Sequence, residues 1–72
     1  MSNPAYFETI VGNVGCVYHG TNHFDALAEF NRYASMSRKG YGRVAGEDVA
    51  LFKDGNLIKE YVGQYAREIP VD

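Results

Sequence analysis

The sequence has little of what usually stabilises or equips a very small protein. Its 72 residues include one cysteine, Cys16, and no tryptophan. A lone cysteine excludes an internal disulfide and suits a reducing compartment. No apolar run approaches membrane-spanning length, and residues 1–4 lack the charged-then-apolar pattern of a signal peptide. We therefore expect a cytoplasmic protein without membrane association.

An excess of either charge is also missing. Seven lysines and arginines face nine acidic residues, which gives a net charge of −2 with histidine neutral. A dedicated DNA-binding protein normally carries a basic excess, so nucleic acid is disfavoured as a partner. The nine acidic residues are also too few for the dense acidic surface of a protein that mimics DNA.

Residues that could carry chemistry are few and poorly spaced. Cys16, His19 and His23 lie close in sequence, with Asp25 nearby. In a regular strand Cys16 and His19 point to opposite faces, and no second pair of ligands completes a tetrahedral metal site. We therefore expect no catalysis, no metal and no cofactor, with Cys16 in the core and both histidines partly exposed. Metal binding or Cys–His catalysis is the alternative.

One helix is predicted, over residues 22–39. Asn22 can cap its N-terminus, and Gly40 can take the left-handed conformation that ends it. Helical spacing separates an apolar and a polar face. The apolar face is formed by Ala26, Leu27, Phe30, Tyr33, Ala34 and Ser37, and the polar face by Asp25, Glu29, Arg32, Met36 and Lys39. Glu29 and Arg32 are also spaced for an ion pair.

A first hairpin is predicted from residues 6–11 and 14–19. Gly12-Asn13 between them is typical of a two-residue type II′ turn, which would place Val11 opposite Val14. In that register one face gathers Phe7, Thr9, Val11, Val14, Cys16 and Tyr18, and the other gathers Tyr6, Glu8, Ile10, Val17 and His19. The first set is the more continuous apolar surface, so we expect it under the helix.

A second hairpin is predicted from residues 49–52 and 57–62. Asp54-Gly55 is a strong signal for a two-residue turn, which would pair Phe52 with Leu57 and Leu51 with Ile58. A three-residue loop with a glycine bulge is the alternative, and it would shift the register by one residue.

The order of elements predicts an α+β fold, ββαββ, with a four-stranded antiparallel sheet and one helix on one face. We expect a single domain over residues 1–72, with flexible ends at 1–4 and 66–72 or a tail that covers a sheet edge. One helix cannot cover both faces, so Ile10, Val17 and part of the second hairpin would stay exposed. Exposed apolar patches mark interaction surfaces, and a core this small is often supported by subunit contacts. Self-association as a homodimer is therefore expected.

The connection over residues 40–48 contains three glycines and is the predicted binding region. A nest of backbone N–H groups there could hold a nucleotide-like anion, with charge from Arg38, Lys39 and Arg43 and a stacking ring from Tyr41. These glycines follow a helix instead of opening one, which excludes the Rossmann and Walker motifs. The alternative is a helix cap followed by a turn with solvated cations. The candidate partner-binding or ligand-binding residues are Arg38, Lys39, Tyr41, Arg43, Glu47, Asp48 and Tyr61.

Tyrosine is the most frequent aromatic residue, with six copies against four phenylalanines. Tyrosine is common in strands and also enriched at protein interfaces. We expect Tyr18 and Tyr33 in the core. Tyr41, Tyr61 and Tyr65 are the expected contact residues.

Several of these motifs also carry a family resemblance. Residues 40–55, Gly-Tyr-Gly-Arg-Val-Ala-Gly-Glu-Asp-Val-Ala-Leu-Phe-Lys-Asp-Gly, follow the helix and lead to Lys59-Glu60-Tyr61. Together with Gly12-Asn13-Val14-Gly15, they make the chain resemble small uncharacterised accessory proteins of tailed bacteriophages. The resemblance implies an early-expressed accessory protein, such as an inhibitor, that binds a host protein or a small molecule. It implies no catalytic residue.

Overall fold

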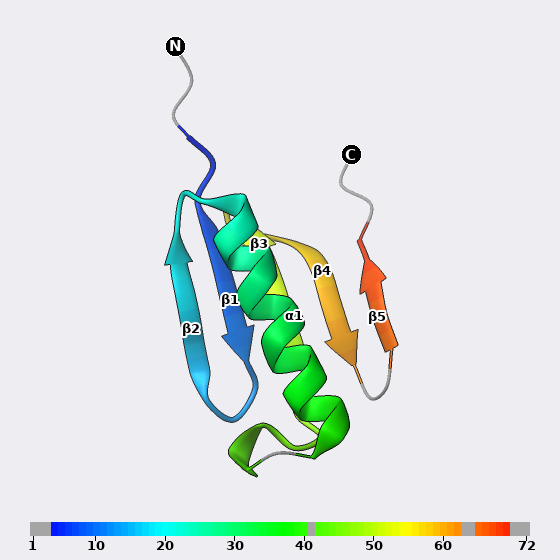
Figure 1. Cartoon of the computed structure of the whole chain (residues 1–72). Coiled ribbons are helices and arrows are strands. Elements are labelled where there is room, and N and C mark those ends of the chain that lie inside the picture. Colours follow the sequence, from blue (N-terminus) through cyan, green and yellow to red (C-terminus); the bar gives the residue numbers. More distant parts are fainter. Residues whose placement is uncertain (1–3, 41, 63–64, 70–72) are drawn as a thin grey trace.

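A computed structural model describes residues 4–40, 42–62 and 65–69. Within these residues the elements are β1 (Phe7–Val11), β2 (Gly15–Gly20), α1 (His23–Lys39), a 3₁₀ turn (Gly42–Val44), β3 (Val49–Lys53), β4 (Asn56–Val62) and β5 (Tyr65–Glu68). The strands form one sheet in the order β2-β1-β3-β4-β5, and every neighbouring pair is antiparallel (Figure 1). The predicted α+β fold with its ββαββ order is confirmed. The sheet gains a fifth strand because part of the tail pairs with the edge of β4.

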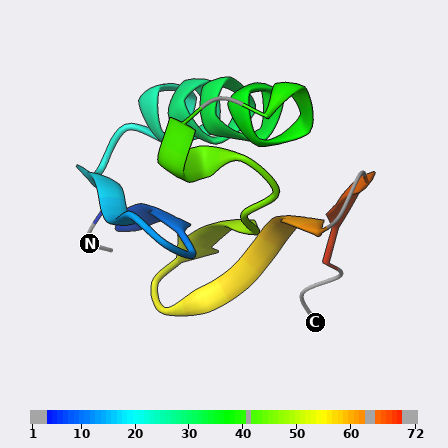
Figure 2. The ribbon, with the colours of Figure 1, turned by 90° about the horizontal axis from the view of Figure 1, so that it is seen from below.

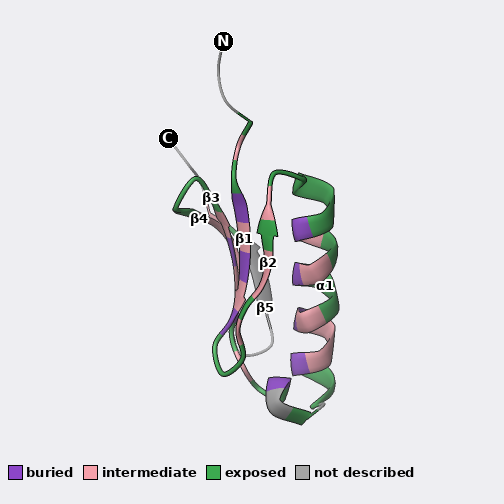
Figure 3. Ribbon diagram, turned by 90° about the vertical axis from the view of Figure 1, so that its left-hand side faces the viewer, coloured by how far each residue is buried: buried purple, intermediate pink, exposed green. Residues whose placement is uncertain are grey.

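The molecule has two layers, with α1 packed across one face of the sheet (Figures 2 and 3). The helix lies over β1, β2 and β3. Buried side chains lie between the two layers, and the buried apolar set is Phe7, Val11, Ala26, Phe30, Ala34, Val44, Val49, Leu51 and Tyr61. No described element covers the opposite face of the sheet.

Both predicted ends of the helix are confirmed. The Asn22 side chain accepts a hydrogen bond of 3.1 Å from the Asp25 N–H. Gly40 adopts the left-handed conformation, with φ of 79°, and its N–H donates to the helix's last turn. Glu29 and Arg32 form the expected pair, 3.2 Å apart. Met36 is the exception on the polar face: it is half-buried against the core, because its long flexible side chain reaches inward from the flank of the apolar stripe.

A hydroxyl also ties the helix to the sheet. Thr9, in the middle of β1, is fully buried, and its Oγ1 donates a hydrogen bond of 2.8 Å to the Ala26 carbonyl. A buried hydroxyl without a partner would destabilise the fold, so this bond fixes where α1 sits along β1.

The predicted register of the first hairpin is wrong. The turn takes three residues, so Val11 pairs with Gly15 and Ile10 pairs with Cys16. A β-bulge then shifts the ladder, and Thr9 pairs with Tyr18. Cys16 and Val14 therefore leave the covered face and are exposed. Val17, the extra residue of the bulge, packs against the core instead of lying on the open face.

The second hairpin is confirmed at its turn and differs beyond it. Asp54 and Gly55 both have positive φ, at 51° and 82°, as a type I′ turn requires, and Phe52 pairs with Leu57. A bulge beside Ile58 then pairs Leu51 with Lys59 and not with Ile58. Every later residue of β4 changes face as a result.

Candidate functional site

The predicted binding loop is more constrained than its glycines suggested. Its N–H groups donate to protein carbonyls: Ala45 to Gly42 at 3.3 Å, Gly46 to Ser37 at 3.1 Å and Glu47 to Val44 at 3.0 Å. The Ser37 hydroxyl closes the loop by donating to the Glu47 carbonyl at 2.7 Å. These three consecutive N–H groups are therefore not available as an anion nest.

The described structure places only part of the predicted anion site. Arg38 and Lys39 are exposed on the last turn of α1. Tyr41 and the side chain of Arg43 lie outside the described residues, as does the side chain of Tyr65. The nucleotide hypothesis for this loop stays a prediction.

The acidic pair at the end of the loop touches the first hairpin. The Gly12 N–H donates a hydrogen bond of 2.9 Å to the Asp48 carbonyl. Glu47 lies so close that a Cβ added at Gly12 would meet its Oε1 at 2.9 Å. Through these contacts the acidic pair holds the turn between β1 and β2.

Tyr61 was expected as a contact residue, and that expectation is wrong. The residue is 3% exposed and belongs to the core. The bulge beside Ile58 brings Tyr61 opposite Val49, on the covered face. Its hydroxyl is buried and has no hydrogen-bond partner among the described residues.

Cys16 and His19 were expected on opposite faces, and they lie on the same one. The bulge at Val17 places Cys16 opposite Ile10 and His19 opposite Glu8, two positions that share the open face. Cys16 is exposed rather than buried in the core, and its thiol donates to the Tyr18 carbonyl at 3.2 Å. Within the described residues, no group of three or more His, Cys, Asp or Glu side chains could hold a metal ion.

The first notable surface is the open face of the sheet. Strand alternation and the observed pairing place five apolar side chains there, namely Ile10, Ala50, Phe52, Leu57 and Val62. Val62 is 48% exposed, and the others are half-exposed because they shield one another. The sequence predicted that this face would be uncovered, although Val17 does not belong to it.

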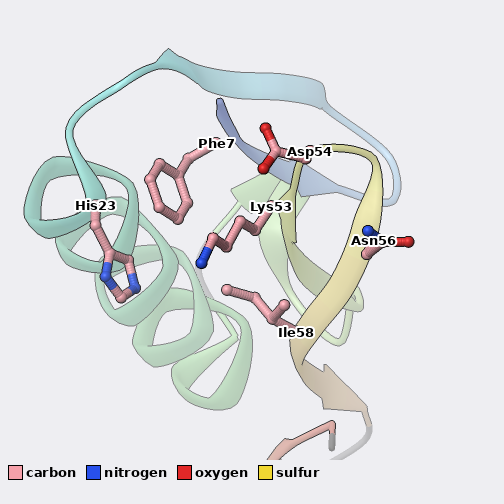
Figure 4. A pocket seen from close by; sticks show the side chains of 6 residues that line it. All are labelled: Phe7, His23, Lys53, Asp54, Asn56 and Ile58. Carbon is pink, nitrogen blue, oxygen red and sulfur yellow. The ribbon is translucent and has the colours of Figure 1, made fainter. Parts of the chain in front are cut away.

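The second notable surface is a groove on the helix side, between α1 and β4, which we call the α1–β4 groove. One compartment has a volume of about 290 Å³ and is lined by Phe7, His23, Lys53, Asp54, Asn56 and Ile58 (Figure 4). The adjoining compartment measures about 270 Å³ and is lined by His23, Leu27, Leu51, Ile58, Lys59, Glu68 and Ile69. The groove exists because α1 lies over β1, β2 and β3, which leaves the helix side of β4 partly open.

Aromatic rings and lysines define the character of this groove. The rings of Phe7 and His23 stack in parallel, with centroids 4.7 Å apart and an interplanar angle of 4°. In Figure 4 the Lys53 ammonium points between these rings and Ile58. Lys59 places its Nζ 5.2 Å from the centroid of the Phe30 ring, a cation–π contact.

Sequence reasoning missed the groove, although one signal for it was present. Val49, Leu51 and Lys53 alternate along β3, so they share the covered face. A lysine in line with two core residues places its charge at the rim of the core. The groove's other wall depends on the bulge at Ile58, which the sequence did not reveal.

Comparisons with known proteins add no relative. No protein-family model, no curated protein and no solved structure matches this chain. Among the described residues, α1 included, no helix has the length and apolar character needed to cross a membrane.

Proposed function

We propose that this protein is a non-enzymatic binding module that forms a homodimer through its open sheet face and binds a host protein. The uncovered apolar face is the observation that carries the dimer. The bacteriophage resemblance, which the motifs of residues 40–55 carry, is the reason to name a host protein as the partner.

A homodimer of standard size would require a modest part of the chain's surface. A standard interface takes about 800 Å² from each partner, which is roughly a sixth of this chain's 4906 Å². Burying about 400 Å² of apolar area would contribute on the order of 10 kcal/mol before the entropic cost of association. A second copy of the chain presents the same apolar strip, so the two faces are self-complementary in character.

The helix side then remains free for the host protein. Phe24, in the first turn of α1, is 82% exposed, the highest value among the exposed large apolar residues of the described chain. Its ring stacks with that of His23 at a centroid distance of 6.2 Å. Exposed aromatic residues of this kind commonly anchor protein interfaces, so Phe24 is the proposed contact.

Light scattering after size exclusion, at micromolar concentration, tests the dimer. The wild-type protein should have about twice the chain's mass of 8.0 kDa. Phe52→Glu should be monomeric, because it puts a charge in the centre of the open face. Phe24→Glu is the matched control and should stay dimeric. A wild-type protein that is monomeric at every concentration would reject the dimer, provided that circular dichroism shows all three proteins folded.

Capture from bacterial lysate on the immobilised protein tests the host contact. A host protein retained by the wild type should be lost with Phe24→Glu, while circular dichroism shows that the variant is folded. Equal retention by both proteins would reject Phe24 as the contact. Failure of the wild type to retain any protein specifically would reject the host-binding part of the proposal.

A further inference from the structure

We propose that the α1–β4 groove binds a small aromatic carboxylate. This site lies on the helix side of the sheet and does not depend on the proposed dimer or on a host protein. The proposal rests on three features of the groove: an ammonium directed into it that forms no ion pair with a described residue, walls of aromatic and aliphatic side chains, and a volume that suits a small ligand.

The first feature is the charge of Lys53. Its ammonium points into the compartment (Figure 4) and forms no ion pair with any described residue. The neighbouring carboxylate of Asp54 is already engaged, because its Oδ1 accepts a hydrogen bond of 2.9 Å from the Tyr6 N–H. Asp54 lines the same compartment and keeps its negative charge, but no ion pair joins it to Lys53 among the described residues. The ammonium is therefore the charged group directed into the compartment, and it suits an anionic group.

The second feature is the pair of walls that flank this ammonium. Phe7 and His23 stack on one side, and Ile58 lies on the other (Figure 4). A flat apolar body between these walls would place a carboxylate beside Lys53. Such a body would gain from burying apolar surface against these side chains.

The third feature is size and the distribution of charge. The compartments measure about 290 and 270 Å³, just below the range of about 300–1,000 Å³ typical of small-molecule sites, so each suits only a small ligand. Lys59 lines the second compartment and adds another cation, whereas Glu68 is the acidic residue there. Lys59 lies directly opposite Glu68, and Asp54 lines the first compartment, so the lining residues carry two positive and two negative charges. The preference for an anion therefore rests on the Lys53 ammonium alone.

Titration with 2-naphthoate and with uncharged 2-naphthalenemethanol tests the proposal, followed by ¹⁵N NMR of the full chain. We expect saturable binding of 2-naphthoate that is about tenfold tighter than binding of the alcohol, a difference expected of one charge-assisted contact. The shifted amides should include His23 and Ile58. Lys53→Met should remove the preference for the carboxylate and leave binding of the alcohol unchanged. Lys39→Met, an exposed lysine at the far end of α1, is the matched control and should keep the preference.

Two outcomes would overturn the inference. Equal affinity for the acid and the alcohol would show that the charge of Lys53 plays no part. Shifts confined to the open face, or no saturable binding up to about 1 mM, near the weak limit of specific binding, would show that the groove is not a site. The Phe52→Glu variant should bind 2-naphthoate as the wild type does, so failure of the dimer and failure of the groove are distinguishable.

Discussion

The two faces of the sheet use neighbouring residues of the same strands in opposite ways. On β1, Val11 is fully buried beneath the helix, whereas the adjacent Ile10 is half-exposed on the open face. On β3, Leu51 is 1% exposed and Phe52 is half-exposed. The difference arises because the single described helix covers one face of the antiparallel sheet and no described element covers the other. One face of the sheet therefore forms the core of the monomer, and the other is the face that we propose as the dimer interface.

The largest expected effect comes from removing the centre of the covered face. Phe30 is fully buried, so Phe30→Ala should cost about 3–5 kcal/mol of unfolding free energy. A core of this size rarely supplies more than about 3–5 kcal/mol, so the variant should be largely unfolded. Urea denaturation followed by circular dichroism measures this, with Phe24→Ala as the exposed control. A loss below about 1 kcal/mol would mean that α1 does not pack here as described.

A sharper comparison uses adjacent residues of β1. Val11→Ala should cost about 2–3 kcal/mol, because it leaves a cavity under the helix. Ile10→Ala removes more carbon atoms but should cost less in the monomer, because the side chain is only half-buried. Both are best measured in the Phe52→Glu background, so that dimer contacts do not contribute. A larger loss of unfolding free energy for Ile10→Ala than for Val11→Ala would contradict the inference that the helix side is the more buried face.

The next substitution should stabilise the protein, whereas the previous ones should destabilise it. Tyr61 buries a hydroxyl without a hydrogen-bond partner among the described residues. Tyr61→Phe removes this group and keeps the ring, so it should raise the unfolding free energy by about 1 kcal/mol. Differential scanning calorimetry would detect the higher melting temperature. Destabilisation would indicate that the hydroxyl is hydrogen-bonded in solution.

The smallest effect belongs to the outer surface of the helix. The Glu29–Arg32 ion pair is 3.2 Å long, and its side chains are 29% and 60% exposed. Solvent weakens such pairs, so Glu29→Gln should cost no more than about 0.5 kcal/mol. The cost should fall further when thermal melts are repeated at high salt. A cost above 1 kcal/mol would place this pair among the interactions that hold the fold together.

The helix and its ends could be predicted because they depend on residues close in sequence. Asn22 caps the turn that follows it, and Gly40 needs only its own conformational freedom to end the helix. The turn at Asp54 and Gly55 was equally local. For these features the sequence was sufficient.

The sequence could not predict which side chains of β2 and β4 lie under the helix, because two bulges decide this. Each bulge, at Val17 and at Ile58, is favoured by contact of its extra residue with the core, which forms only when α1 packs on the sheet. One inserted residue moves the side chains of the residues that follow it to the other face of the sheet. This explains why Tyr61 is in the core, why Cys16 and His19 share a face, and why the α1–β4 groove was missed.

The bulge at Val17 also affects how the chain can aggregate. β2 is an edge strand, and an edge with evenly spaced free N–H and C=O groups invites further strands to add, as in amyloid. A bulge bends the strand and interrupts that spacing, so a second chain cannot pair along the whole edge in register. The proposed association through the open face would stop at two copies, because each copy would use the same patch. The bulge therefore disfavours open-ended growth from the β2 edge, which is compatible with the closed dimer that we propose.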